Sequence, residues 1–193
     1  MDSEITLYHS PNTRSSGVRI LLEELRAPHR LHVLDMRAGD NHRDAYLAIN
    51  PMGKVPAITH GGAVVTEQAA IFFYLADLFP EAGLAPAIGD PLRGPYLRWM
   101  VFYGSSFEPA VIDRALEREP GPQAMSGYGD FDRVLATLVD ALKKGPYLLG
   151  ERFSAADVLW GSALSWTVGF KLVPEDPAIM AYLARRNARA AVQ

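Results

Sequence analysis

The alternation of apolar and polar positions at the start of the chain predicts a strand, a helix and a second strand. Residues 5–8 have strand composition and are followed by the turn-prone sequence Ser-Pro-Asn at 10–12. Apolar side chains then recur with the i, i+3, i+4, i+7 spacing of an amphipathic helix, at Val18, Leu21, Leu22 and Leu25. A second strand is expected at 31–34. A β-α-β unit of this length implies parallel strands and a right-handed crossover.

The following segment predicts a β-hairpin and another helix. Two short apolar runs, 56–60 and 63–65, flank Gly61-Gly62, which is a strong signal for a two-residue hairpin turn. A helix is expected from about Glu67 and ends before Pro80. Its predicted apolar face consists of Ala70, Ile71, Tyr74, Leu75 and Leu78. The order β-α-β-β-β-α therefore completes a compact α/β domain over residues 1–80.

Beyond residue 80 the pattern becomes entirely helical. Residues 81–95 contain three prolines and three glycines, so we assign 81–91 to a linker and 92–193 to a second domain. A helical stripe follows, made of Phe131, Val134, Leu135, Leu138, Val139 and Leu142. Ser154 and Asp157 have the spacing of a capping box, with Phe153 and Val158 placed for a hydrophobic staple. The second half is therefore predicted to be an all-α bundle.

The composition is that of an ordinary globular protein and narrows the range of partners. The 193 residues suit one large domain or two small ones, and a formal charge of −3 gives no general attraction to nucleic acid or to an anionic membrane. No apolar run is long enough to cross a bilayer, and the acidic, polar N-terminus does not resemble a secretory signal. We therefore expect a cytoplasmic protein.

The chain has no cysteine, which limits the chemistry that its own side chains can supply. A disulfide framework, a thiolate metal site and a cysteine nucleophile are all excluded. The five histidines lack metal-ligand spacing, so no metal is expected, and the G-x-S-x-G, phosphate-loop and H-E-x-x-H motifs are absent. Any sulfur chemistry would therefore use a sulfur atom that a small molecule brings.

Three segments of the first domain carry the candidate chemistry. Residues 10–15 place hydroxyl groups at a helix start, where N–H groups are unpaired and the dipole is positive. In residues 50–56, Pro56 opens a strand after a glycine-containing turn and is a candidate for a cis bond that aims the backbone of Val55 outward, toward an extended peptide. Glu67 and Gln68 begin a helix and could hold the ammonium and carboxylate of an amino acid. Each segment alone also fits an ordinary cap or turn.

Taken together, these segments resemble the first domain of the cytosolic glutathione transferases, especially the bacterial ones. The resemblance rests on Ser-Pro-Asn-Thr-Arg-Ser at 10–15, Asn-Pro-Met-Gly-Lys-Val-Pro-Ala at 50–57 and Thr-Glu-Gln-Ala-Ala-Ile at 66–71. Phe-Ser-Ala-Ala-Asp at 153–157 looks like the capping motif of the family's second domain. The resemblance covers nearly the whole chain and implies a thioredoxin-like α/β domain followed by an all-α helical bundle.

The resemblance implies glutathione as cosubstrate, a small electrophile as second substrate, and a homodimer. Val55, before a cis Pro56, would pair with the cysteine backbone of glutathione, while Glu67 and Gln68 would hold its γ-glutamyl group. Lys54 would face the glycine carboxylate. Asn41 and His42, from the family's polar second-helix segment, would assist Lys54.

The resemblance places the thiol-activating position on Asn12, which has an amide but no hydroxyl group. Thr13 is the nearest hydroxyl, with Ser15 and Ser10 close behind. For the electrophile pocket, the candidates are Tyr103, Phe107, Trp166 and Phe170, although a place in the bundle core explains each one equally simply.

Two alternative functions fit the same fold. The missing hydroxyl at Asn12 is compatible with a protein that binds glutathione without transferring it. A glutathione-dependent isomerase, dehalogenase or peroxidase would differ only in the second-substrate pocket.

Overall fold

The fold is given by a computed structural model, which describes residues 4–119 and 121–190. The chain divides into two compact units, one ending at Ala85 and the other beginning at Pro86. Each unit has its own core and is described by itself.

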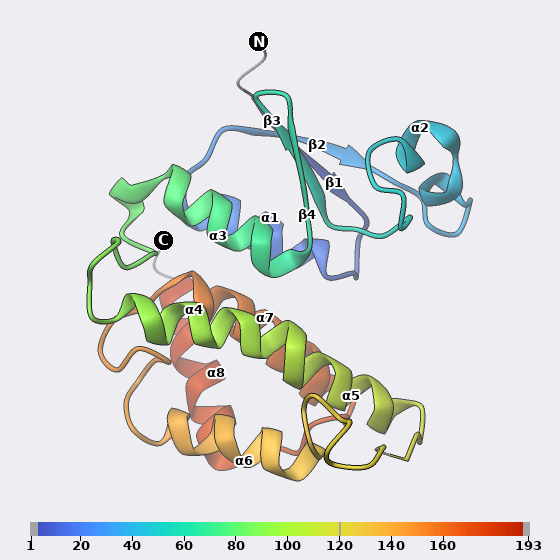
Figure 1. Cartoon of the computed structure of the whole chain (residues 1–193). Helices are drawn as coiled ribbons and strands as arrows, with labels where there is room; N and C mark the ends of the chain where they lie inside the picture. Colours follow the sequence, from blue (N-terminus) through green and yellow to red (C-terminus); the bar gives the residue numbers. More distant parts are fainter. Residues whose placement is uncertain (1–3, 120, 191–193) are drawn as a thin grey trace. The chain divides into compact units, whose positions relative to one another are not determined.

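The first unit is a four-stranded mixed sheet with helices (Figure 1). Its main elements are β1 (Ile5–His9), α1 (Ser15–Glu24), β2 (His29–Val33), α2 (Asp44–Leu47), β3 (Ala57–His60), β4 (Ala63–Thr66) and α3 (Gln68–Leu78). Single 3-10 turns lie at Asp40–His42 and Pro80–Ala82. The strand order is β2-β1-β3-β4, with β1 parallel to β2 and the other pairs antiparallel. The predicted β-α-β unit, hairpin and thioredoxin-like arrangement are confirmed.

Helices α1 and α3 cover the same face of this sheet (Figure 1). The four apolar positions predicted for α1 are all buried. In α3 the predicted face is only half right, because Ile71 and Leu75 are buried whereas Ala70 and Leu78 are exposed. Phe72 and Ala76 complete the buried side. Nearly every residue of α3 is apolar, so periodicity alone could not locate the side that meets the sheet.

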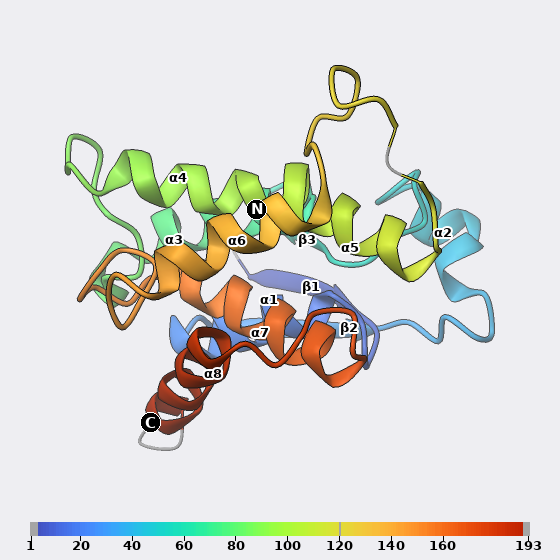
Figure 2. The same ribbon diagram turned by 90° about the horizontal axis from the view of Figure 1, so that it is seen from below.

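The second unit is a bundle of helices, as predicted (Figures 1 and 2). It contains α4 (Arg93–Phe102), a π-helical turn (Tyr103–Phe107), α5 (Glu108–Ala115), α6 (Phe131–Leu142), α7 (Ala155–Gly169) and α8 (Pro177–Ala190). Among its described residues the only β-type pairing is two isolated bridges within 147–152. Helix α7 packs against α4 and α8, and α6 packs against α8 and α5.

The start of α7 is fixed by the predicted capping box between Ser154 and Asp157. The fully buried carboxylate of Asp157 accepts from the backbone N–H groups of Ser154 and Leu148, both at 2.9 Å, and from the Tyr182 hydroxyl at 3.1 Å. Burial raises the pKa of Asp157, and these hydrogen bonds act in the opposite direction. One side chain therefore joins the start of α7, the preceding loop and α8.

Candidate functional site

The three candidate segments meet at one end of the sheet in the first unit. Tyr8 on β1 is opposite Ala57 on β3, and Ala57 is opposite Thr66 on β4. The turn after β1, the bend before β3 and the start of α3 therefore emerge side by side. The amide of Gln68 also donates a 3.0 Å hydrogen bond to the carbonyl of Arg14, which joins the third segment to the first.

A compact hydrogen-bond network occupies the turn after β1. The fully buried Ser15 hydroxyl lies 2.7 Å from the Thr13 hydroxyl and 2.8 Å from Nδ1 of His9, and it accepts from the N–H of Ser10 at 3.1 Å. Thr13 donates its own proton to the carbonyl of Ser10 at 2.7 Å. Ser10 is itself buried. The hydroxyl groups of Thr13 and Ser15 are thus engaged within the turn, and Ser15 is shielded from any ligand.

Asn12 differs from its hydroxyl-bearing neighbours because it is exposed. Its backbone has φ of 59°, the left-handed region that asparagine tolerates better than most residues. The structure records no hydrogen bond from its side chain or backbone N–H to another described residue. The Ser10 hydroxyl has no recorded partner among the described residues either, but Ser10 is buried, so Asn12 is the exposed candidate with open donors.

His9 also takes part in this network, although no motif in the sequence singles it out. It is the last residue of β1 and is buried, with its ring bonded to Ser15. Burial, with a smaller contribution from the positive charge of Arg19, lowers the pKa of His9. Burial therefore favours the neutral form of the ring. A histidine on the inward side of a short strand is the only signal that could have identified it.

The predicted cis peptide bond is present between Val55 and Pro56. The carbonyl of Lys54, just before it, accepts from the Tyr46 hydroxyl and from the Asn50 amide, the latter at 2.8 Å. Neither the N–H nor the carbonyl of Val55 hydrogen-bonds to another described residue. The loop is therefore held from behind while one residue offers a free donor and a free acceptor, the pattern that an extended peptide requires.

The loop before this bend also accounts for two other candidates. Asn41 is buried and donates to the carbonyl of Gly53 at 2.9 Å, while its own side-chain oxygen has no partner among the described residues. Gly53 has φ of 61°, and a Cβ there would lie 3.0 Å from the Asn41 carbonyl, so glycine is required. His42 and Lys54 are exposed, and Lys54 makes no ion pair within the described chain.

The third segment contains an unusual backbone conformation. Glu67, the residue before α3, is exposed and has φ of 63° and ψ of 119°, which is a costly conformation for a residue with a side chain. Gln68 follows at the first position of the helix, and its side-chain oxygen is buried without a partner among the described atoms. Such strain concentrates where a ligand fixes the position of a side chain.

The four aromatic candidates of the second unit have two different environments. Tyr103 and Phe107 are buried around Trp160, with ring centroids 5.8 Å and 4.9 Å from it, so they belong to the bundle core. Trp166 and Phe170 are 48% and 63% exposed, and their ring centroids lie 4.8 Å apart at the end of α7. The exposed pair is the one available to contact an apolar ligand.

The described residues show neither a metal-binding cluster nor a membrane-spanning helix. They contain no group of three or more His, Asp or Glu side chains arranged to hold a metal ion. None of their helices combines the length and apolar character needed to cross a membrane.

Comparison with known proteins connects this site to one family. The glutathione S-transferase N-terminal domain matches residues 11–78, and the glutathione S-transferase C-terminal domain matches 109–185. Glutathione S-transferase GstA of Escherichia coli O157:H7 is 27% identical over 190 residues, which cover 97% of this chain and 94% of that protein.

Solved structures extend the similarity to three dimensions. A glutathione transferase from Methylococcus capsulatus str. Bath is 33% identical, with a TM-score of 0.80 over 98% of this chain and 95% of its own. A glutathione transferase homologue from Sulfitobacter, solved with bound glutathione, is 29% identical, with a TM-score of 0.76 over 98% and 95% of the two chains.

Proposed function

The chain belongs to the glutathione S-transferase family, and we propose on that basis that it binds glutathione, ionises its thiol and transfers the glutathionyl group to a small hydrophobic electrophile. One observation supports the proposal above all: Tyr8, Ala57 and Thr66 are cross-strand partners on β1, β3 and β4. Their pairing brings three separate segments to one end of the sheet. These segments offer the groups that a γ-glutamyl tripeptide needs.

The open backbone of Val55 pairs with the central residue of glutathione in this proposal. The carboxylate of Glu67 receives the ammonium of the γ-glutamyl group, and the N-terminus of α3 with Gln68 receives its carboxylate. Lys54 and His42, both exposed, face the glycine carboxylate. Asn41 positions Gly53 and hence the loop, because its amide is already committed to the Gly53 carbonyl.

Asn12 activates the thiol in this proposal. A free thiol with a pKa near 8.5 is only a few per cent ionised at neutral pH. The Asn12 amide and the positive end of α1 can together lower that pKa by about two units, worth roughly 2.7 kcal/mol. Thr13 and Ser15 support the turn, since their hydroxyl groups are bonded within it.

The transfer step then forms one bond and breaks one. The thiol proton leaves to solvent, the sulfur attacks the electrophilic carbon, and the leaving group departs with its electron pair. Trp166 and Phe170 offer apolar surface for the electrophile. The buried Tyr103 and Phe107 stiffen the helices that carry this surface.

Calorimetric titration with glutathione, beside a turnover assay with an activated aryl halide, tests the proposal. We expect both binding and turnover in the wild type, and binding at least about tenfold weaker in Glu67→Gln because one charged contact is lost. Glu23→Gln is the matched control, since Glu23 is an exposed residue paired with Arg19 on α1. Binding without turnover would instead favour a non-catalytic glutathione-binding protein, and absence of binding would refute both. If the protein turns over an isomerase, dehalogenase or peroxidase substrate but not the aryl halide, that other activity is its function.

We also propose that the protein is a homodimer that uses the outer face of α3. Ala70 and Leu78 are exposed there, and with the half-buried Tyr74 and the neighbouring Val65 they border a hollow of about 540 Å³, which Phe73 and Asp77 also line. We call Val65, Ala70, Tyr74 and Leu78 the α3 surface. An apolar strip of this kind is typical of a protein–protein contact. The cytoplasmic location stays a prediction.

A further inference from the structure

The peptide group between Lys54 and Val55 is held from one side only. Its carbonyl oxygen accepts two hydrogen bonds, from the Tyr46 hydroxyl and from the Asn50 amide. The cis bond of this loop comes one residue later, so this peptide group is trans and its N–H points away from its C=O. That N–H, which belongs to Val55, bonds to no described residue. The two bonds that fix the carbonyl therefore also fix the direction of the open donor.

The two donors to this carbonyl belong to one well-packed segment. Tyr46, in α2, is 3% exposed and Asn50 is 4% exposed. The backbone N–H of Asn50 donates to the Tyr46 carbonyl at 2.9 Å, which ties the two residues together. The Tyr46 ring also lies against that of Tyr8 on β1, with ring centroids 5.6 Å apart. The support of the loop therefore reaches back to the sheet.

Packing alone does not account for the Tyr46 hydroxyl. A phenylalanine would make the same ring contact with Tyr8, and Asn50 alone would give the Lys54 carbonyl a partner. Burial raises the pKa of Tyr46, against a smaller opposing effect of its hydrogen bond with Asn50, so the hydroxyl stays protonated and remains a donor at neutral pH. Two donors on one carbonyl polarise the peptide group and strengthen its N–H as a donor.

We propose that Tyr46 is a positioning residue that sets the affinity for glutathione, because it directs and strengthens the Val55 N–H that donates to the tripeptide. The inference rests on the glutathione site proposed above. In that site Val55 pairs with backbone atoms of glutathione and not with its sulfur, so the ground state and the transition state gain equally from this contact. Tyr46 therefore controls the dissociation constant and KM of glutathione, and leaves kcat and the thiol pKa unchanged.

Tyr46→Phe, which removes the hydroxyl and keeps the ring, tests this role. We expect calorimetry to show glutathione binding about fivefold weaker, with kcat at saturating glutathione and the pKa of the bound thiol unchanged. In NMR spectra of the free protein, the proton and nitrogen signals of the Val55 amide should move upfield, because the peptide group is less polarised. This readout does not depend on glutathione.

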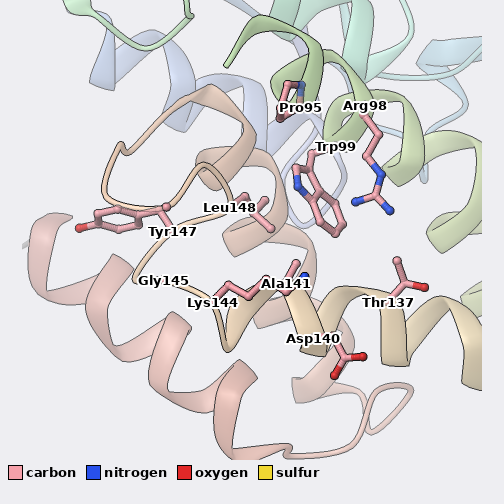
Figure 3. Close-up of a pocket in the computed structure, with 11 residues that line it drawn as sticks. Pro95, Arg98, Trp99, Thr137, Asp140, Ala141, Lys144, Gly145, Tyr147 and Leu148 are labelled. Atoms are coloured by element: carbon pink, nitrogen blue, oxygen red, sulfur yellow. The ribbon is translucent and has the colours of Figure 1, made fainter. Parts of the chain in front are cut away.

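Two controls remove hydroxyl groups that form hydrogen bonds elsewhere. Tyr128→Phe loses a 2.8 Å bond to Asp113, and Thr137→Val loses a 2.8 Å bond to the Arg133 carbonyl. Both residues belong to the helical unit, where Thr137 lies on α6 beside a hollow of about 690 Å³ (Figure 3). Both variants should bind glutathione as the wild type does and leave the Val55 signals in place.

A second variant removes the other donor to the same carbonyl. Asn50→Asp keeps the oxygen that accepts from the Met52 N–H at 3.1 Å, but a carboxylate oxygen replaces the donor to Lys54. Glutathione should therefore bind more weakly than to Tyr46→Phe. Wild-type affinity in either variant would overturn the inference, as would an unmoved Val55 signal or an equal fall in kcat. A wild type that does not bind glutathione, with the Val55 signal moved as expected, would refute the proposed function while the orientation of Val55 by Tyr46 stands.

Discussion

At the scale of single residues, the polar side chains of the turn after β1 have two different roles. Some form hydrogen bonds within the turn and stabilise it, whereas one is available to contact a ligand. The sequence offers four polar candidates within six positions, and the family resemblance alone points to Asn12 among them. The structure ranks them by where their protons go. Thr13 and Ser15 bond to Ser10 and to each other, whereas Asn12 is exposed with its donors open. Asparagine can therefore take the place that a hydroxyl residue would otherwise fill.

Replacement of Asn12 should act on the thiol rather than on the affinity for glutathione. We expect Asn12→Ala to raise the pKa of bound glutathione by about one unit, because one charge-assisted hydrogen bond to sulfur is lost. The rate below neutral pH should then fall about tenfold. The measurements are the pH–rate profile and the ultraviolet titration of the bound thiolate, with the dissociation constant of glutathione as the control.

Two comparison variants sharpen this prediction. Asn12→Asp preserves the shape of the side chain but places a negative charge near sulfur, so the thiol pKa should rise further than in Asn12→Ala. Thr13→Ala should shift the pKa less than either, because its proton goes to the Ser10 carbonyl. If Thr13→Ala shifts the profile and Asn12→Ala does not, the assignment of the activating residue is wrong.

At the scale of elements, the sequence predicts what depends on local pattern and fails where neighbours decide. The strands, the Gly61-Gly62 hairpin, the cis bond at Pro56 and the capping box of α7 all have local signals, and all are present. The buried side of α3 has no local signal, because the helix carries apolar residues on all of its sides. Tyr46 and His9 were missed for a related reason. Their roles arise from contacts with Lys54 and Ser15 that no spacing in the sequence encodes.

The capping box is the element whose loss should cost most. Asp157→Asn replaces an acceptor by an amide that must direct N–H groups toward buried donors, so we expect about 3 kcal/mol of destabilisation. Urea unfolding at neutral pH gives the value. Asp130→Asn is the control, because Asp130 caps α6 with a single 2.8 Å bond from Arg133 and asparagine caps helices equally well. Similar losses in the two variants would show that the carboxylate of Asp157 has no special part in joining α7 to its neighbours.

At the scale of the whole molecule, the α3 surface is the feature that a monomer leaves unexplained. Leu78 and Ala70 add nothing to the core of the first unit, yet they lie in line with Tyr74 on one side of the helix. Exposed apolar side chains at one-turn spacing cost solubility unless another surface covers them. The homodimer proposed above would cover them with a second copy of the chain.

Charge placed on this surface should therefore dissociate the proposed dimer without unfolding the subunit. We expect Ala70→Glu with Leu78→Glu to raise the dimer dissociation constant by at least about a hundredfold, because each carboxylate would be buried unpaired at the contact. Sedimentation equilibrium measures the constant, and circular dichroism verifies that the subunit stays folded, as it should, since both side chains are exposed within it. Ile88→Glu, at a side chain 93% exposed outside the α3 surface, controls for the added charge. A double variant that sediments as the wild type does would assign the contact to another face, and a wild type that is monomeric would remove the dimer altogether.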